Sequence, residues 1–154
     1  MQKLNDGLAI AGELTIKTYK DGVLLRTIGP FKNKVVSSAG YGRNLILRAV
    51  AGDTSLPTVI NSAAIGTGTV PPVDADTGLG TPVISGLGIT SMSVANNVLT
   101  IDVFVTSATL TNGTYAEFGF FATSRLISRV LITPSYTKAT GEDSLFTYTL
   151  TLAG

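Results

Sequence analysis

The sequence predicts an all-β domain, a β-sandwich or a jelly roll, with one short α-helix. Hydrophobic residues make up 44% of the chain and charged residues only 14%, so threonine, serine and glycine must supply much of the surface, and threonine suits a pleated, half-buried sheet. About eight short apolar or alternating runs separated by turn residues recur along the chain. Because only one stretch has helical periodicity, a parallel α/β sheet is disfavoured.

The length of 154 residues suits a single domain. We assign that domain to residues 13–154 and interpret residues 1–12 as a flexible leader. The first strong element is a hairpin, in which residues 13–19 and 23–28 alternate on either side of an Asp-Gly pair that favours a tight turn. A Gly-Pro pair at residues 29–30 is expected to end the second strand.

The one helical pattern covers residues 41–51. Ser38 is the expected N-cap, and Gly52 can end the helix in a left-handed conformation. The residues that fall on one apolar face at helical spacing are Leu45, Ile46, Ala49 and Val50.

A strand is expected at residues 58–65, and the stretch that follows, up to Pro82, reads as a long surface loop. Its prolines have a fixed φ and no N–H, so it cannot be an internal strand. A second hairpin turns at Asn96 and Asn97 within residues 91–105. The remaining expected strands are residues 115–121, 126–132 and 144–152.

The residue types present exclude several kinds of chemistry. The chain has no cysteine and no histidine, which rules out disulfides, thiolate zinc sites and the commonest general base. A net charge of +1 with no basic run gives no support for nucleic-acid binding, and no apolar run approaches the roughly 20 residues of a membrane span. We therefore expect no cofactor, no metal, no nucleic acid, no membrane partner and no catalysis.

Two features of the long loop could indicate a ligand-binding site. Gly66 and Gly68 could approach a phosphate, but prolines follow where a phosphate loop needs a lysine and a helix start, so an ordinary bend is favoured. Asp74 and Asp76, with Asp53 upstream, could offer oxygens to calcium, but no closing glutamate completes a calcium loop. Capping in a solvated loop is the favoured reading of these aspartates.

Glu117 lies inside Tyr-Ala-Glu-Phe-Gly-Phe-Phe, the most aromatic stretch of the chain. A catalytic carboxylate is one reading, but a structural ion pair or a subunit contact is favoured, because no second positioned carboxylate or tryptophan platform is evident. Alternation places Phe118 and Phe120 on one face, with Glu117, Gly119 and Phe121 on the other. Burial of both faces, within the sandwich and against a neighbouring subunit, is expected.

Three stretches together carry a family likeness: residues 33–52; residues 64–83, where a strand ends in Gly-Thr-Gly-Thr before prolines and Asp-Thr-Gly-Leu; and residues 117–121 with the later strands, Lys138 included. In their order and spacing they resemble a family of tailed-bacteriophage virion proteins, found as capsid decoration proteins and as tail or fibre components. The family often has an acidic residue and an arginine where this chain has Thr81-Pro82-Val83, so contacts made by those charges are not expected.

The resemblance implies a β-sandwich virion protein, commonly a homotrimer, that binds itself and the major capsid protein or other virion proteins and catalyses nothing. We expect a capsid decoration protein on the particle surface, made in the host cytoplasm. The alternatives are a tail, baseplate or fibre-attachment subunit, a host-glycan-binding module and, more distantly, a carboxylate glycan hydrolase. The leader could lie along a coat subunit. The expected partner-binding residues are Gly66, Gly68, Pro71, Pro72, Asp74, Asp76, Glu117 and Phe121.

Overall fold

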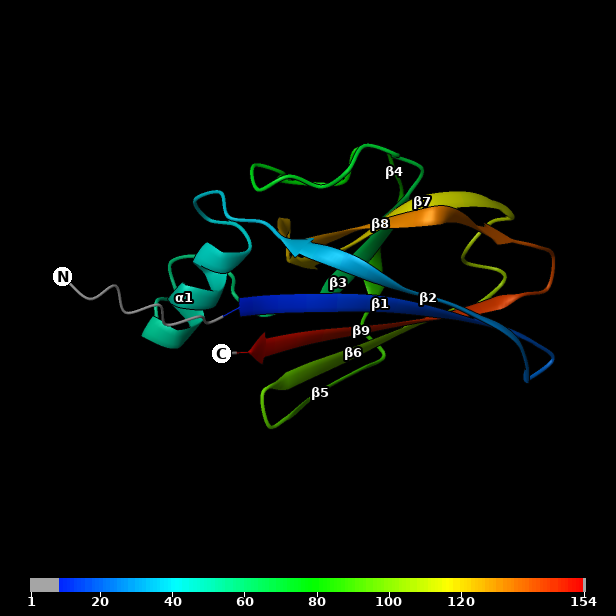
Figure 1. Ribbon diagram of the computed structural model, residues 1–154, viewed down its shortest axis with the longest axis horizontal. Coiled ribbons are helices and arrows are strands. Elements are labelled where there is room, and N and C mark those ends of the chain that lie inside the picture. Colours follow the sequence, from blue (N-terminus) through cyan, green and yellow to red (C-terminus); the bar gives the residue numbers. More distant parts are fainter. Residues whose placement is uncertain (1–8, 154) are drawn as a thin grey trace.

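Residues 9–153 fold into a single nine-stranded antiparallel sheet with one short helix. The computed structural model describes residues 9–153. Its strands follow the order β4-β3-β7-β8-β2-β1-β9-β6-β5, and the sheet curls into a half-barrel with α1 at one end (Figure 1). The predicted all-β class with one short helix is confirmed, and the strands belong to one continuous sheet.

The elements in chain order are β1 (Ala9–Lys20), β2 (Val23–Val35), α1 (Arg43–Ala51), β3 (Ser62–Gly66), β4 (Pro82–Gly88), β5 (Ser91–Ala95), β6 (Val98–Val105), β7 (Gly113–Ala122), β8 (Arg125–Lys138) and β9 (Asp143–Ala153). In the described part of the chain α1 is the one α-helix, and it has neither the length nor the apolar content of a membrane span.

The first hairpin, β1–β2, is confirmed. Asp21 and Gly22 form its turn with φ of 50° and 77°. However, β1 begins at Ala9, which pairs with Ala153 of β9. Residues 9–12, which the sequence assigned to a flexible leader, are therefore part of a paired strand, and the rest of that leader, residues 1–8, lies outside the described residues.

The expectation that the Gly-Pro pair at residues 29–30 ends the second strand is wrong. The pairing of β2 with β1 shifts register there, between the Leu14–Phe31 and Ile16–Ile28 pairs, and a bulge of this kind accommodates a proline that has no N–H to donate. Past the bulge β2 still pairs with β1 at Phe31 and Lys32, and from Asn33, opposite Val130, it pairs with β8. One strand thus joins the two halves of the sheet.

The helix is confirmed, but its N-cap is Gly42 rather than Ser38. A side chain at Gly42 would overlap the carbonyl of Val36, and that carbonyl accepts a hydrogen bond from the Arg43 N–H at 2.8 Å. Gly52 ends the helix with a φ of 69°, as predicted. The expected apolar face is only partly correct, because Leu45 is fully buried whereas Val50 is 84% exposed.

The sequence missed one strand. β3 is shorter than expected, and β4 follows the long loop as an edge strand whose first residue is Pro82, one of the positions where a sheet tolerates proline. The β5–β6 hairpin is confirmed, with Asn96 at a φ of 52° in its turn. The last three predicted strands are also confirmed and are longer than expected.

Aromatic rings from the two halves of the sheet meet inside the curl. Phe118 of β7 stacks on Phe146 of β9 with ring centroids 4.5 Å apart, and Phe120 lies 4.7 Å from Tyr148. Strands β8, β2 and β1 separate β7 from β9 in the sheet, so the rings meet only because the sheet folds back on itself. All four are essentially fully buried, and they form the centre of the core.

Candidate functional site

The long loop between β3 and β4, residues 67–81, is held by one buried carboxylate. Glu117 points outward from β7 beneath the loop and has no exposed surface. Its oxygens accept hydrogen bonds from the backbone N–H groups of Gly68 at 3.0 Å, Gly80 at 2.9 Å and Thr81 at 2.6 Å. Both ends of the loop are therefore attached to the same side chain.

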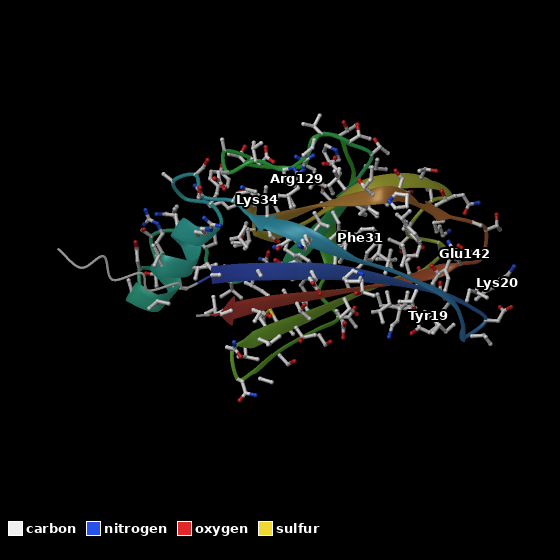
Figure 2. All side chains as sticks on the ribbon, in the orientation of Figure 1. Tyr19, Lys20, Phe31, Lys34, Arg129 and Glu142 are labelled. Atoms are coloured by element: carbon white, nitrogen blue, oxygen red, sulfur yellow. The ribbon has the colours of Figure 1, made fainter. Side chains whose placement is uncertain are left out.

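Arg129 of β8 completes this arrangement. Its side chain is 3% exposed and meets Glu117 through Nε at 3.0 Å and Nη2 at 2.8 Å. The same guanidinium donates to Asp76 at 2.9 Å and to the carbonyl of Val70 at 2.8 Å, both within the loop. Figure 2 shows Arg129 on the side of the sheet that the loop crosses. The ion pair thus fixes the middle of the loop as well as its ends.

Small residues make room for this contact. A Cβ on Gly66 would lie 2.6 Å from a Glu117 oxygen, and one on Gly119 would lie 2.9 Å from a side-chain carbon of Leu79. Leu79 thus packs over Gly119 on the outer face of β7. On the outer face of this strand Glu117 and Gly119 are buried by the chain's own loop, and Phe121 is half-buried. Burial of that face against a neighbouring subunit stays a prediction.

The other predicted site residues are distributed around the same loop or away from it. Asp74 is exposed and pairs with Lys34 of β2 at 3.1 Å, and its carbonyl accepts from the Ser37 N–H at 2.9 Å. Pro71 is exposed and Pro72 half-buried. Phe121 lies elsewhere, half-buried beside a separate hollow of about 240 Å³.

The structure therefore brings together Gly66, Gly68, Asp76 and Glu117, with Pro71, Pro72 and Asp74 on the loop that they support. Because Gly66 and Glu117 are buried, they hold the loop in place from beneath and cannot themselves contact a partner. The sequence predicted no role for Arg129 or for Lys34. The available signal was an arginine inside the apolar run of residues 126–132, because a buried cation needs a partner.

The charges of the loop define what the site can do chemically. Burial by itself raises the pKa of Glu117, but the hydrogen bonds from Thr81, Gly80, Arg129 and Gly68 outweigh it and hold the pKa below the ordinary 4.5. At neutral pH this carboxylate has no proton to donate. Among residues 9–153 no three acidic side chains gather as a metal site would require. The geometry is that of a fixed loop.

The lowered pKa of Glu117 predicts a pH-dependent stability. Because the pKa is lower in the folded chain than in the unfolded one, this carboxylate stabilises the fold fully above the ordinary pKa of 4.5, and the stabilisation is lost as pH falls through the folded value. The difference in unfolding free energy between the native chain and Glu117→Gln should therefore shrink below about pH 4. Urea denaturation at pH 7, 5, 4 and 3 measures it, and a constant difference would contradict the pairing.

Substitutions of two loop glycines distinguish a glycine that packs against Glu117 from one that lies in open space. A Cβ on Gly68 would lie 2.5 Å from a Glu117 oxygen, whereas one on Gly78, in the same loop, would meet nothing within 4 Å. Gly68→Ala should therefore lower the free energy of unfolding by about 1 to 3 kcal/mol, and Gly78→Ala should change it by less than about 0.5 kcal/mol. Thermal unfolding of the two variants gives the comparison, and equal losses would contradict this account.

Comparison with known proteins adds no relative. No protein-family model matches the chain, and no curated protein and no solved structure matches it either. What the site does must follow from its own geometry.

Proposed function

We propose that this chain is a structural protein on the surface of a tailed-phage particle, where it decorates the capsid shell. One observation carries the proposal: residues 67–81 form a loop fixed from beneath by the Glu117–Arg129 pair. A loop that is already ordered loses little conformational entropy when a partner binds. Such a loop suits a contact that must persist.

The outer surface of the loop is apolar and neutral enough to contact another protein. Val70 is 69% exposed and Val73 is 52% exposed, with Pro71 exposed beside them. The charged side chains near them are paired: Asp76 with Arg129, and the exposed Asp74 with Lys34. Several such loops on one oligomer would bind a repeating coat lattice with high avidity, although each contact is weak. The proposed partners are thus other copies of this chain and the major capsid protein.

The finer fold class belongs to this proposal. The Phe118–Phe146 and Phe120–Tyr148 contacts bring the two halves of the curled sheet face to face, which supports treating them as the two layers of a β-sandwich. That architecture is the one that the phage resemblance implies. Synthesis in the host cytoplasm and assembly onto the particle follow from the proposed role.

The deciding experiment counts this protein against the major coat protein in purified particles by quantitative mass spectrometry. Copies on the order of hundreds per particle are expected if several sit around each repeat of the shell. A handful of copies would place the chain in the tail or baseplate and contradict the decoration role. Its absence from particles, or binding to a glycan array instead, would contradict the virion proposal itself.

A variant pair tests the loop as the contact surface. Val73→Lys should reduce the copies bound per particle at least about tenfold, since a charge in an apolar contact is costly. Val23→Lys is the matched control, because Val23 is 63% exposed in the distant β1–β2 turn region. Both variants should unfold like the native chain. Equal particle binding by the two would show that the loop is not the contact.

A further inference from the structure

The described sheet ends in two edge strands that differ in protection. β4 begins with Pro82, contains Gly86 at a φ of 73° and pairs irregularly with β3. These are devices that discourage another strand from adding to an edge. β5, in contrast, is Ser-Met-Ser-Val-Ala, without proline, glycine or charge, and it pairs with β6 in an unbroken register. Its outer backbone groups have no partner strand within residues 9–153.

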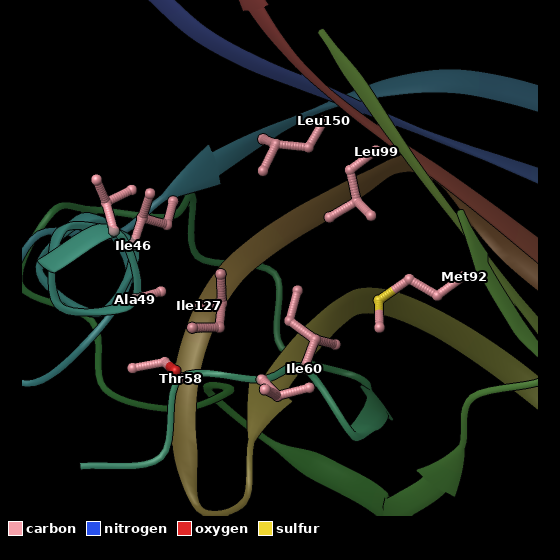
Figure 3. Close-up of a pocket in the computed structure, with 10 residues that line it drawn as sticks. Ile46, Ala49, Thr58, Ile60, Met92, Leu99, Ile127 and Leu150 are labelled. Atoms are coloured by element: carbon pink, nitrogen blue, oxygen red, sulfur yellow. The ribbon is translucent and has the colours of Figure 1, made fainter. Parts of the chain in front are cut away.

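An apolar groove lies beside this unprotected edge, between α1 and the β5–β6 hairpin (Figure 3). One part has a volume of about 280 Å³, and a second part of about 260 Å³ continues from it. Met92 lines the first part and Val94 the second, at exposures of 43% and 74%. The two parts share the side chains of Ile46, Leu99 and Leu150.

We propose that a second copy of this chain covers the β5 edge and closes the groove. In the proposed dimer the two β5 strands pair antiparallel about a two-fold axis through Ser93. Met92 of each copy then lies opposite Val94 of the other, on the groove side, and the serines and Ala95 lie on the other side. The two grooves join into one apolar strip that the pairing removes from water.

A second copy fits this edge better than a different protein does. β5 has no charge with which to select a charged partner, whereas the sequence Ser-Met-Ser-Val-Ala complements itself under a two-fold rotation. The net charge of +1 leaves only weak repulsion between copies. Two-fold pairing uses up the β5 edge of both copies, and the remaining β4 edges are protected, so the association stops at a dimer. The inference rests on the proposed function in one respect: that function includes self-association, and the β5 pairing says how the copies associate.

Sedimentation equilibrium tests the pairing. The native chain should show a mass of twice 15.9 kDa. Val94→Lys places a charge on the edge at a position that is 74% exposed and so tolerates it in the fold, and the dissociation constant should rise at least about tenfold. Val83→Lys, on the other edge strand and 48% exposed, should stay a dimer. A native monomer or trimer, or equal behaviour of the two variants, would overturn the inference.

A cysteine pair tests the register. The chain has no cysteine, so Ser93→Cys can form a disulfide only between copies. In the proposed register the two Cα atoms at position 93 are roughly 4.5 to 5.5 Å apart, within the range a disulfide spans. Ser93→Cys should therefore form a covalent dimer on mild oxidation, and Ser91→Cys, which faces Ala95 of the other copy, should not. Equal cross-linking by the two would overturn the two-fold register.

The dimer and the proposed function can be disproved independently of each other. A Val94→Lys monomer that still binds particles leaves the decoration role intact, and a dimer that never enters particles removes that role without touching the interface.

Discussion

Replacing Glu117 by glutamine is expected to lower the free energy of unfolding by about 3 to 5 kcal/mol. The substitution leaves the buried Arg129 without its closest anion, and Asp76 meets only its Nη1 atom. The amide nitrogen of the new side chain would also direct a donor at backbone N–H groups that are themselves donors. Urea denaturation at pH 7, followed by circular dichroism, measures the loss.

The matched control is Glu13→Gln, which removes a carboxylate of the same kind from an exposed position on β1. It should change the free energy of unfolding by less than about 0.5 kcal/mol. Arg129→Met combined with Glu117→Gln should cost less than the sum of the single losses, because both act on one ion pair. A loss below about 1 kcal/mol in Glu117→Gln would contradict its role as the anchor of the loop.

Phe146→Ala is expected to cost about 3 to 5 kcal/mol of unfolding free energy. Phe146 has no exposed surface, stacks on Phe118 at 4.5 Å and meets the edge of Tyr136 at 6.2 Å. The truncation would leave a cavity where the two halves of the sheet meet, and a rigid sheet closes such a cavity only partly. Chemical denaturation of the variant gives the value.

Phe104→Ala provides the comparison for that core substitution. Phe104 lies on β6, next to Val103, which pairs with Phe146, but its ring is 44% exposed. The same change of residue should cost less than half as much there, because water already reaches the ring. Equal losses at the two positions would mean that the interior contact between the halves contributes nothing special.

The sequence predicted the elements whose signals are local. The turns at Asp21 and at Asn96 both need a positive φ, and both residue types tolerate it beside alternating strands. β4 lacked such a signal. Its Ser-Gly-Leu-Gly composition is poor for a strand, and it becomes one by pairing with β3 across the long loop. The curl of the sheet was equally hidden, because it depends on which distant strands become neighbours.

One residue of the site, Glu117, could be predicted from the sequence, but its hydrogen-bond and ion-pair partners could not. Glu117 attracted attention because it interrupts an aromatic run, and an ion pair was the favoured reading. Its N–H partners, however, lie 36 to 49 positions earlier in the chain. The choice of Arg129 depends on the register of β7 with β8, where Glu117 is opposite Leu131 and Arg129 sits two places along on the same face. No pattern in the sequence states that register.

The shared strand β2 has a mechanical consequence. The loop lies beside β2 and β8 at one side of the curl, and β5 ends the sheet at the other. Between β2 and the free edge, force passes sideways through the β1, β9 and β6 ladders, and the β1–β9 ladder runs without interruption from Ala9 to Tyr19. A pull between a coat subunit on the loop and a second copy on β5 would load these ladders together. Tension would then be carried from one attachment point to the other through paired strands.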